Sequence, residues 1–307
     1  MSERINWTSR LGFILASAGA AVGLGAIWKF PYLAGSNGGS AFLFPYLVLS
    51  FTIGLTLVIA EITLGRLGKG GIVTAYRTIA GKGWTVFGYL GILTGFCVLC
   101  FYSAIGGWTI SYFIDALLGN GIVTDVSELN AHFGALVSNP YISIGYQAAF
   151  LFLTAWVVLF DVAKGIERLN KILMPLLFVL VLVLIVRGVT LPGAEKGIAY
   201  LFAWKPETFT WQSLLAAMGF TFFSLCVGCG CMLTYGSYLS KDTNLLTGCS
   251  WITFLATFSS ILGGLMILPS VFAFDLDPTA GPGLTFMTMP IVFAKLPFGQ
   301  AFAVIFY

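Results

Sequence analysis

Long apolar stretches alternate with short polar segments along the whole chain. A helix needs about 20 mainly apolar residues to cross the hydrocarbon core of a bilayer, and stretches of that length recur here between charged and turn-forming residues. The expected spans are 11–34, 40–64, 85–117, 140–160, 167–189, 211–239 and 244–273, with a further span beginning near residue 298. The pattern therefore predicts an all-helical membrane protein that crosses the bilayer many times.

Composition supports the same conclusion. Hydrophobic residues make up 58% of the 307 residues and charged residues only 9%, which is too apolar for a water-soluble globule. The net charge of +3 is spread over loops, so no basic face predicts binding to nucleic acid. The first ten residues lack the layout of a cleaved signal peptide, so we expect the first apolar stretch to be a span of the mature protein.

The basic residues predict the orientation of the chain. Ten of the fifteen Lys and Arg residues lie at the N-terminus or in the segments 65–84, 161–171 and 240–243: Arg4, Arg10, Arg66, Lys69, Arg77, Lys82, Lys164, Arg168, Lys171 and Lys241. The segments on the opposite side, 118–139, 190–210 and 274–297, contain only Lys196, Lys205 and Lys295. Because cytoplasmic loops carry the excess of Lys and Arg, the N-terminus is predicted to lie in the cytoplasm. The protein itself is predicted to reside in the cell membrane.

The residues that could support catalysis or metal binding are few. All six cysteines (Cys97, Cys100, Cys226, Cys229, Cys231 and Cys249) lie in apolar stretches, where cysteine packs as a small hydrophobic residue. The pair Cys97 and Cys100 is one helical turn apart, but the single histidine, His132, lies in a distant polar segment. Packing is therefore favoured over metal or redox chemistry, and without a nucleophile–base pair an enzyme is not expected.

Two of the expected spans contain glycines near their middle. These are Gly19, Gly23 and Gly25 in the first span, and Gly228 and Gly230 in the sixth. Glycine weakens a helix, and unwound backbone at membrane depth is tolerated where it lines a protected cavity. Close helix packing is the alternative use of such glycines. Spans one and six would be equivalent in two five-helix repeats, which favours a binding site at the centre of the bilayer.

Two charged residues lie inside or beside apolar spans. Glu61 stands in the second span about one turn before a basic loop, where a carboxylate must be paired, protonated or hydrogen-bonded to freed backbone. The alternative is that it reaches the membrane surface and pairs with Arg66. Lys29, near the outer end of the first span, is either an interfacial anchor or half of a gate, and its spacing does not decide between them.

Motifs along the chain resemble one transporter family. The run from Trp7 to Pro31, with NGGSAF at 37–42, resembles the first helix and following loop of the neurotransmitter:sodium symporter family. Further matches occur in order: EITLGR at 61–66, KGIER at 164–168, TYGSY at 234–238 with Lys241 and Asp242, and GPGLTF at 281–286. Such proteins have more spans than this chain contains, so a truncated chain or gene fragment is favoured over a protein that natively ends at Tyr307.

The resemblance implies the leucine-transporter-type fold, an all-α inverted repeat in one transmembrane domain over 1–307. The first repeat, about 11–189, is complete, and the second, about 211–307, is partial because it stops in the eighth helix. The inverted-repeat arrangement is itself known from this family, so the argument from the glycines is not independent of the resemblance.

The resemblance also implies a substrate site. Backbone N–H groups around Ala21, Gly23 and Gly25, with the hydroxyl of Tyr102, would bind a substrate carboxylate, since the N-terminus of a half-helix attracts anions. Val98, Phe223, Ser224, Cys226 and Cys229 would line the side-chain end, with Phe223 and Tyr102 as an aromatic lid. Gly23 replaces the aspartate of amine-selective members, so an amino acid is expected rather than a monoamine.

The resemblance implies that one of the family's two sodium sites and its cytoplasmic gate are retained, while the other sodium site is altered. One sodium site would use the backbone carbonyls of Gly19 and Val22 together with groups beyond the chain. The other site's ligands match Ala26, Ser224 and Leu255, so two amide oxygens are replaced by hydrocarbon and a single sodium ion is expected. The cytoplasmic gate matches at Arg4, Trp7 and Tyr238. The role of chloride and the oligomeric state stay open.

The sequence thus predicts a sodium-coupled amino-acid symporter working by alternating access. A proton-coupled or uncoupled amino-acid carrier is one alternative, with Glu61 as proton carrier. A membrane substrate sensor that does not transport is the other.

Overall fold

The computed structural model describes residues 7, 9–23, 25–120, 126–159, 162–240, 243–279, 284–295 and 297–307. In its first half the helices are α1 (Arg10–Val22), η1 (Gly25–Lys29), α2 (Phe30–Ser36), α3 (Ser40–Leu49), η2 (Ser50–Gly54), α4 (Leu55–Gly68), α5 (Ile72–Ala80), η3 (Lys82–Trp84), α6 (Thr85–Leu118) and α7 (Val126–Ser138). In its second half they are α8 (Pro140–Leu159), α9 (Val162–Val189), α10 (Ala194–Phe202), η4 (Pro206–Thr208), α11 (Trp211–Ser224), α12 (Cys231–Gly236), α13 (Leu245–Ala273), α14 (Leu284–Ala294) and α15 (Gly299–Phe306). The described residues form no strand, and the predicted all-helical class is confirmed.

The expected spans are present with two interruptions. Among the described residues, five helices are long and apolar enough to cross a membrane: Ser40–Gly68, Lys82–Leu118, Pro140–Leu159, Gly165–Val189 and Leu245–Ala273. The first expected span is a bent pair, Arg10–Val22 and Gly25–Ser36, with 42° between its halves. The sixth is divided into α11 and α12 by a turn over 225–230. The eighth begins at Gly299, as α15.

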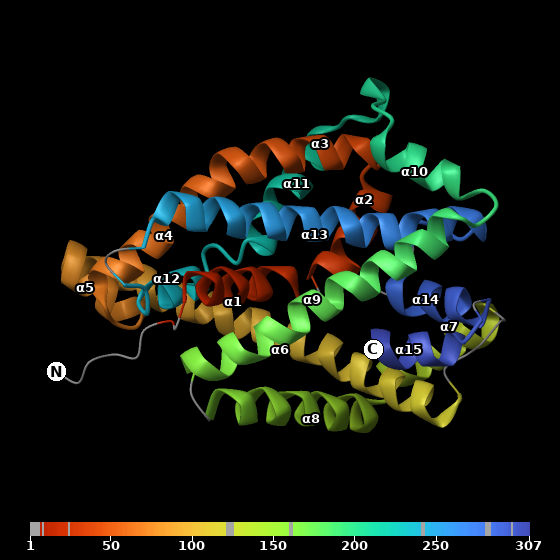
Figure 1. The fold of residues 1–307 in the computed structure, drawn as a ribbon, viewed down its shortest axis with the longest axis horizontal. Coiled ribbons are helices and arrows are strands. Elements are labelled where there is room, and N and C mark those ends of the chain that lie inside the picture. Colours follow the sequence, from red (N-terminus) through yellow and green to blue (C-terminus); the bar gives the residue numbers. More distant parts are fainter. Residues whose placement is uncertain are drawn as a thin grey trace.

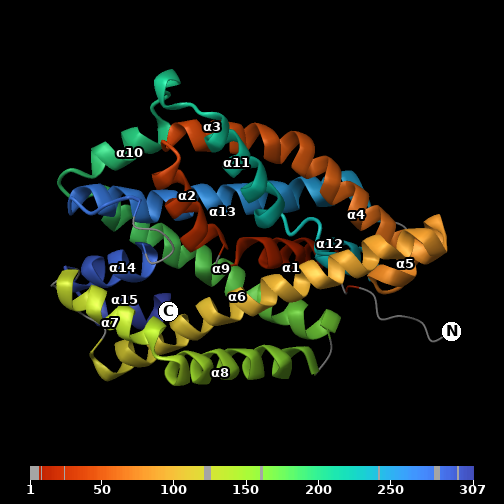
Figure 2. The same cartoon turned by 180° about the vertical axis from the view of Figure 1, so that it is seen from behind.

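Helix α13 is the central element. Figures 1 and 2 show α3 and α4 along one side of it and α1, α9, α6 and α8 on the other. Within the described residues, 67% of the spanning stretch of α13 is buried inside the protein, compared with none of that of α8. Helix α8 therefore lies at the edge, where its apolar surface would face lipid.

Local sequence explains where the helices around the centre begin. Ser9 caps α1 by accepting a hydrogen bond from the backbone N–H of Gly12 at 2.9 Å. Thr210 and Ser213 form a reciprocal capping box at the start of α11, and Asn244 caps α13 through the N–H of Thr247. Each cap satisfies backbone donors that a helix leaves free in its first turn.

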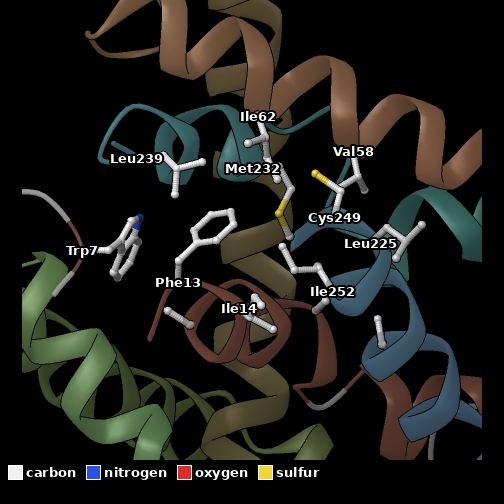
Figure 3. Packing of buried hydrophobic residues seen from close by; sticks show 13 residues of the cluster. Trp7, Phe13, Ile14, Val58, Ile62, Leu225, Met232, Leu239, Cys249 and Ile252 are labelled. Carbon is white, nitrogen blue, oxygen red and sulfur yellow. The ribbon is translucent and has the colours of Figure 1, made fainter. Parts of the chain in front are cut away.

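Two buried clusters hold the interrupted helices in place. One joins α1, α4, α12 and α13 and contains Trp7, Phe13, Ile62, Met232 and Ile252 at its centre (Figure 3). The other joins α2, α3 and α11 through the rings of Phe30, Phe42, Tyr46 and Phe220, whose centroids are 5.0–6.1 Å apart. The breaks in the first and sixth spans lie between these two clusters.

Four helices lie in segments that the apolar pattern predicted to be connections: α5, α7, α10 and α14. Helix α14 packs on α13 and α7, and α10 packs on α13. They are too short to span a membrane, so a search for long apolar stretches does not find them.

Candidate functional site

The two helix interruptions face each other beside α6. The thiol of Cys226, in the turn after α11, donates a hydrogen bond to the carbonyl of Ala20 in α1 at 3.3 Å. A β-carbon on Gly25 would lie 2.7 Å from the ring of Phe223, and one on Gly23 would lie 2.5 Å from the hydroxyl oxygen of Tyr102. The glycines predicted to break the first span are therefore needed for close approach to α11 and α6.

The turn that divides the sixth span begins after Ser224, several residues before the predicted glycines, Gly228 and Gly230. Helix α11 ends at Ser224, and the backbone of Cys226 has a φ of 52°, with 90° at Gly228 and 76° at Gly230. Left-handed conformations at these positions end the helix and start α12 from Gly230. The sequence predicted the glycines of this break but not its start.

A cavity of about 500 Å³ lies between the interruptions and α6. Seven of the nine predicted substrate residues line it: Ala21, Gly25, Val98, Tyr102, Phe223, Cys226 and Cys229. Its other lining residues, which sequence reasoning missed, are Ala20, Thr94, Gly95, Leu99, Phe222, Val227 and Cys231. None of the described lining residues is charged. The cavity has hydroxyl and backbone groups near Tyr102 and is otherwise lined by hydrocarbon and sulfur.

Ser224, a predicted substrate residue, does not line the cavity. Its side chain is buried, donates a hydrogen bond to the carbonyl of Thr221 at 3.2 Å, and lies 3.3 Å from the hydroxyl of Tyr46 on α3. Its hydroxyl is therefore directed at α3 while Phe222 and Phe223 line the cavity. Gly23 does not line the cavity either, but it adjoins the hydroxyl of Tyr102.

A cluster of hydroxyls lies behind the cavity. The hydroxyl oxygen of Tyr46 is 3.3 Å from Oγ of Ser224 and 3.1 Å from Oγ of Ser260. The hydroxyls of Ser50 and Thr257 adjoin Tyr46 and are buried without a geometric hydrogen-bond partner in the described part of the chain. Five hydroxyl groups therefore gather in a buried space between α3, η2, α11 and α13.

Glu61 is hydrogen-bonded to freed backbone. Its Oε1 accepts a hydrogen bond at 2.7 Å from the N–H of Gly228, inside the turn between α11 and α12. Arg66, the alternative partner, instead donates from Nη1 to the carbonyl of Thr243 at 2.9 Å. The buried carboxylate thus holds the interrupted sixth span against α4, which compensates part of its desolvation.

Trp7 packs over the N-terminal end of the first span. Its indole N–H donates to the carbonyl of Tyr235 at 3.0 Å, and its backbone N–H donates to the carbonyl of Tyr238 at 3.2 Å. The ring packs on Phe13 in the cluster of Figure 3 and makes edge contacts with Tyr235 and Tyr238. Arg4, the other predicted gate residue, lies outside the described residues, and Tyr235 was not predicted.

Lys29 is directed toward the cavity wall. Its ammonium nitrogen lies 3.5 Å from the centroid of the Phe223 ring. Phe223 in turn stacks on Phe101, which makes an edge contact with Tyr102. The two predicted lid residues are thus linked through Phe101, an aromatic residue that no motif singled out.

The carbonyls proposed for sodium lie in the last turn of α1. A helix leaves its last four carbonyls without an intrahelical partner, and since α1 ends at Val22 these belong to residues 19–22. Val22 and Ala26 border a small space of about 10 Å³ with Ser259, whose hydroxyl donates to the carbonyl of Leu255 at 2.7 Å. Carbonyl oxygens such as these are ligands that suit a hard monovalent cation. Gly19 and Val22 together border a separate space of about 290 Å³ beside Asn170.

Leu255, which matches a ligand position of the other sodium site, packs with Ala18, Val22 and Met174. Its side chain offers only hydrocarbon at that position.

The apolar helices and the paired interruptions are features of a multi-pass membrane protein with its candidate site between the interruptions. The model of the sodium:neurotransmitter symporter family matches residues 4–122 and 142–307, and the chain belongs to that family. The predicted family and fold class are therefore confirmed, and the protein is a transporter rather than an enzyme.

Individual proteins with similar sequences or structures support the membership of this family. The chain is 39% identical over 305 residues to an uncharacterized sodium-dependent transporter, YhdH, of Bacillus subtilis (strain 168), covering 98% of this chain and 68% of the relative. It is 30% identical to the human sodium- and chloride-dependent GABA transporter 2, covering 99% of this chain and 58% of that protein. The crystal structure of MhsT in complex with L-phenylalanine superposes with a TM-score of 0.94 at 41% identity, over 99% of this chain and 69% of MhsT.

Proposed function

We propose that this protein is a sodium-coupled symporter of an apolar amino acid, with an aromatic amino acid such as phenylalanine as the best fit. The observation that carries the proposal is the cavity between the two interruptions, with Tyr102 beside Gly23 at one end and Val98, Cys226 and Cys229 along its walls. Its volume of about 500 Å³ is within the range of about 300–1,000 Å³ for small-molecule sites.

The two ends of the cavity suit the two ends of such a substrate. The backbone N–H groups at the start of η1 and the hydroxyl of Tyr102 would bind the carboxylate, since the N-terminus of a helix favours an anion. The apolar walls would bind the side chain, and thioether or thiol sulfur packs well on aromatic rings. MhsT, which is similar in fold and sequence, was crystallised with L-phenylalanine.

Sodium would bind at the carbonyls of Gly19 and Val22, next to the substrate. Coupling follows because both ligands would hold the same helix end, so that each favours the same conformation of α1. One ion is proposed, since Ala26 and Leu255 offer no side-chain oxygen at the other position. The N-terminus is proposed to be cytoplasmic, and the two interrupted spans are proposed to occupy equivalent places in repeats of about 11–189 and 211–307.

The hydroxyl cluster around Tyr46 is the candidate for an anion. Hydroxyl donors at 3.1–3.3 Å from one another, in a buried space without a carboxylate among the residues named, can turn their hydrogens toward one chloride ion. The name of the human relative includes chloride dependence. If chloride binds here, replacing it by gluconate should weaken amino-acid binding to the wild type, and Ser260→Ala should weaken binding in chloride without affecting it in gluconate.

Equilibrium binding to the purified full-length protein tests the substrate assignment. Labelled L-phenylalanine should bind in sodium and not in potassium. Unlabelled phenylalanine should displace it, and phenylethylamine, which lacks the carboxylate, should not. Displacement by the amine, or equal binding in potassium, would contradict the proposal.

A further inference from the structure

A buried carboxylate lies between α1 and the start of α9 and has no part in the site described above. Glu167 is 2% exposed. Its Oε1 accepts a hydrogen bond from the ammonium of Lys171, one turn further along α9, at 2.7 Å. It also accepts one from the hydroxyl of Ser9, on the other side of the helix interface, at 3.4 Å. A buried carboxylate is costly without such partners.

The carboxylate is placed against the first turn of α1. Ser9 is the N-cap of that helix, and its hydroxyl accepts from the N–H of Gly12 while it donates to Glu167. A β-carbon on Gly12 would overlap Oε1 of Glu167, so only glycine leaves room for the carboxylate. The partial positive charge at a helix N-terminus favours an anion at this position.

A second contact of the same kind lies two turns further along. A β-carbon on Gly19 would overlap Oδ1 of Asn170, whose amide nitrogen donates to the carbonyl of Ile166 at 3.0 Å. Gly12 and Gly19 are seven residues apart, about two helical turns, and Glu167 and Asn170 share one face of α9. Two polar side chains of α9, Glu167 and Asn170, therefore occupy the spaces left by the missing β-carbons of Gly12 and Gly19 in α1.

We propose that Glu167 is a positioning residue of the transport cycle, holding the cytoplasmic half of the first span against α9 while Trp7 closes the cytoplasmic end. Helix α1 carries Ala20 and Ala21 of the cavity and ends in the carbonyls of Gly19 and Val22. Any opening toward the cytoplasm that moves this helix must first separate Glu167 from Ser9 and the first turn of α1. The proposal rests on the proposed function, because such a movement belongs to a carrier.

The native cysteines provide the test. Cys226, Cys229 and Cys231 line the cavity, whereas Cys249 is buried in the cluster around Trp7 and does not. In inside-out vesicles containing the full-length protein, a membrane-impermeant thiosulfonate reagent should reach the first three only when the cytoplasmic end opens. Mass spectrometry of the labelled peptides gives a rate for each cysteine.

Glu167→Gln, which keeps the size and removes the charge, should raise the labelling rate of the cavity cysteines about tenfold, equivalent to about 1.4 kcal/mol. Gly12→Ala should act in the same direction, because its β-carbon displaces the carboxylate. Gly12→Ala combined with Glu167→Asp, whose shorter side chain makes room, should return toward the wild-type rate. Glu128→Gln, at an exposed carboxylate on α7, is the matched control and should leave the rate unchanged.

Wild-type labelling rates in both Glu167→Gln and Gly12→Ala would overturn the proposal. So would an equal rise in Glu128→Gln, because that indicates an effect of removing any carboxylate. These rates are measured without substrate, so a failure of phenylalanine binding contradicts the proposed function and leaves the result on Glu167 standing.

Discussion

The ammonium of Lys29 lies over the ring of Phe223, 3.5 Å from its centroid. This contact links η1, directly after the interruption of the first span, to the last turn of α11, directly before the interruption of the sixth. Phe223 also lines the cavity. The pair therefore joins the two halves of the candidate site on one side of the substrate space.

Lys29→Gln should shorten the time that a bound amino acid stays in the cavity. A cation over an aromatic ring contributes about 0.5–2 kcal/mol, so the dissociation rate should rise about two- to thirtyfold, with little change in the association rate. Stopped-flow displacement of labelled phenylalanine measures it. Lys205→Gln, at an exposed lysine far along the chain, is the control, and an unchanged rate in Lys29→Gln would show that the contact does not retain substrate.

Tyr102→Phe should weaken binding of the amino acid. The change removes one hydrogen bond to a carboxylate, about 1.5–3 kcal/mol, or about ten- to hundredfold in affinity. A ligand without a carboxylate, such as the amide of the same amino acid, should lose much less. Equal losses for the acid and the amide would mean that Tyr102 only shapes the cavity.

The orientation of the chain can be tested with two single cysteines introduced into a cysteine-free background. A probe at Ser127, exposed on α7, should react with an impermeant reagent added outside cells, and a probe at Thr78, exposed on α5, should not. The reverse result would refute a cytoplasmic N-terminus, which was derived from the positions of Lys and Arg alone.

Sodium stoichiometry provides a fourth prediction. A dehydrated sodium ion needs about five or six oxygens, and Ala26 and Leu255 have hydrocarbon side chains where amides would be required. Substrate binding should therefore rise with sodium with a Hill coefficient of about one. A clear two-ion dependence would mean that a second site is built from other oxygens, for which the buried hydroxyl of Thr257 is the nearest candidate.

Sequence patterns predicted the spans and both interruptions, because these depend on composition and on glycine. Half of the cavity lining, seven of fourteen residues, was expected from the family resemblance alone. Both kinds of prediction failed where the direction of a single side chain matters. Ser224 and Phe223 are neighbours in sequence, yet Phe223 lines the cavity and Ser224 does not. A one-residue step along a helix turns the side-chain direction by about 100°. A continuous apolar sequence does not show which of its side chains points into the cavity.

Contacts between distant segments were also beyond the sequence. Phe101 between Tyr102 and Phe223, Tyr235 under Trp7, and Glu167 against Gly12 each depend on how two helices are placed beside each other. Glu61 was predicted in part. The cost of burying a carboxylate predicted that it needs a partner, and the structure identifies that partner as the backbone N–H of Gly228.

The central claim, sodium-coupled uptake of an apolar amino acid, is tested most directly by transport into proteoliposomes containing the full-length protein. With sodium outside, potassium inside and the same pH on both sides, labelled phenylalanine should accumulate above its external concentration, and the gradient should collapse when a sodium ionophore is added. Accumulation that requires a pH gradient and persists without sodium would contradict the account, as would binding without any uptake.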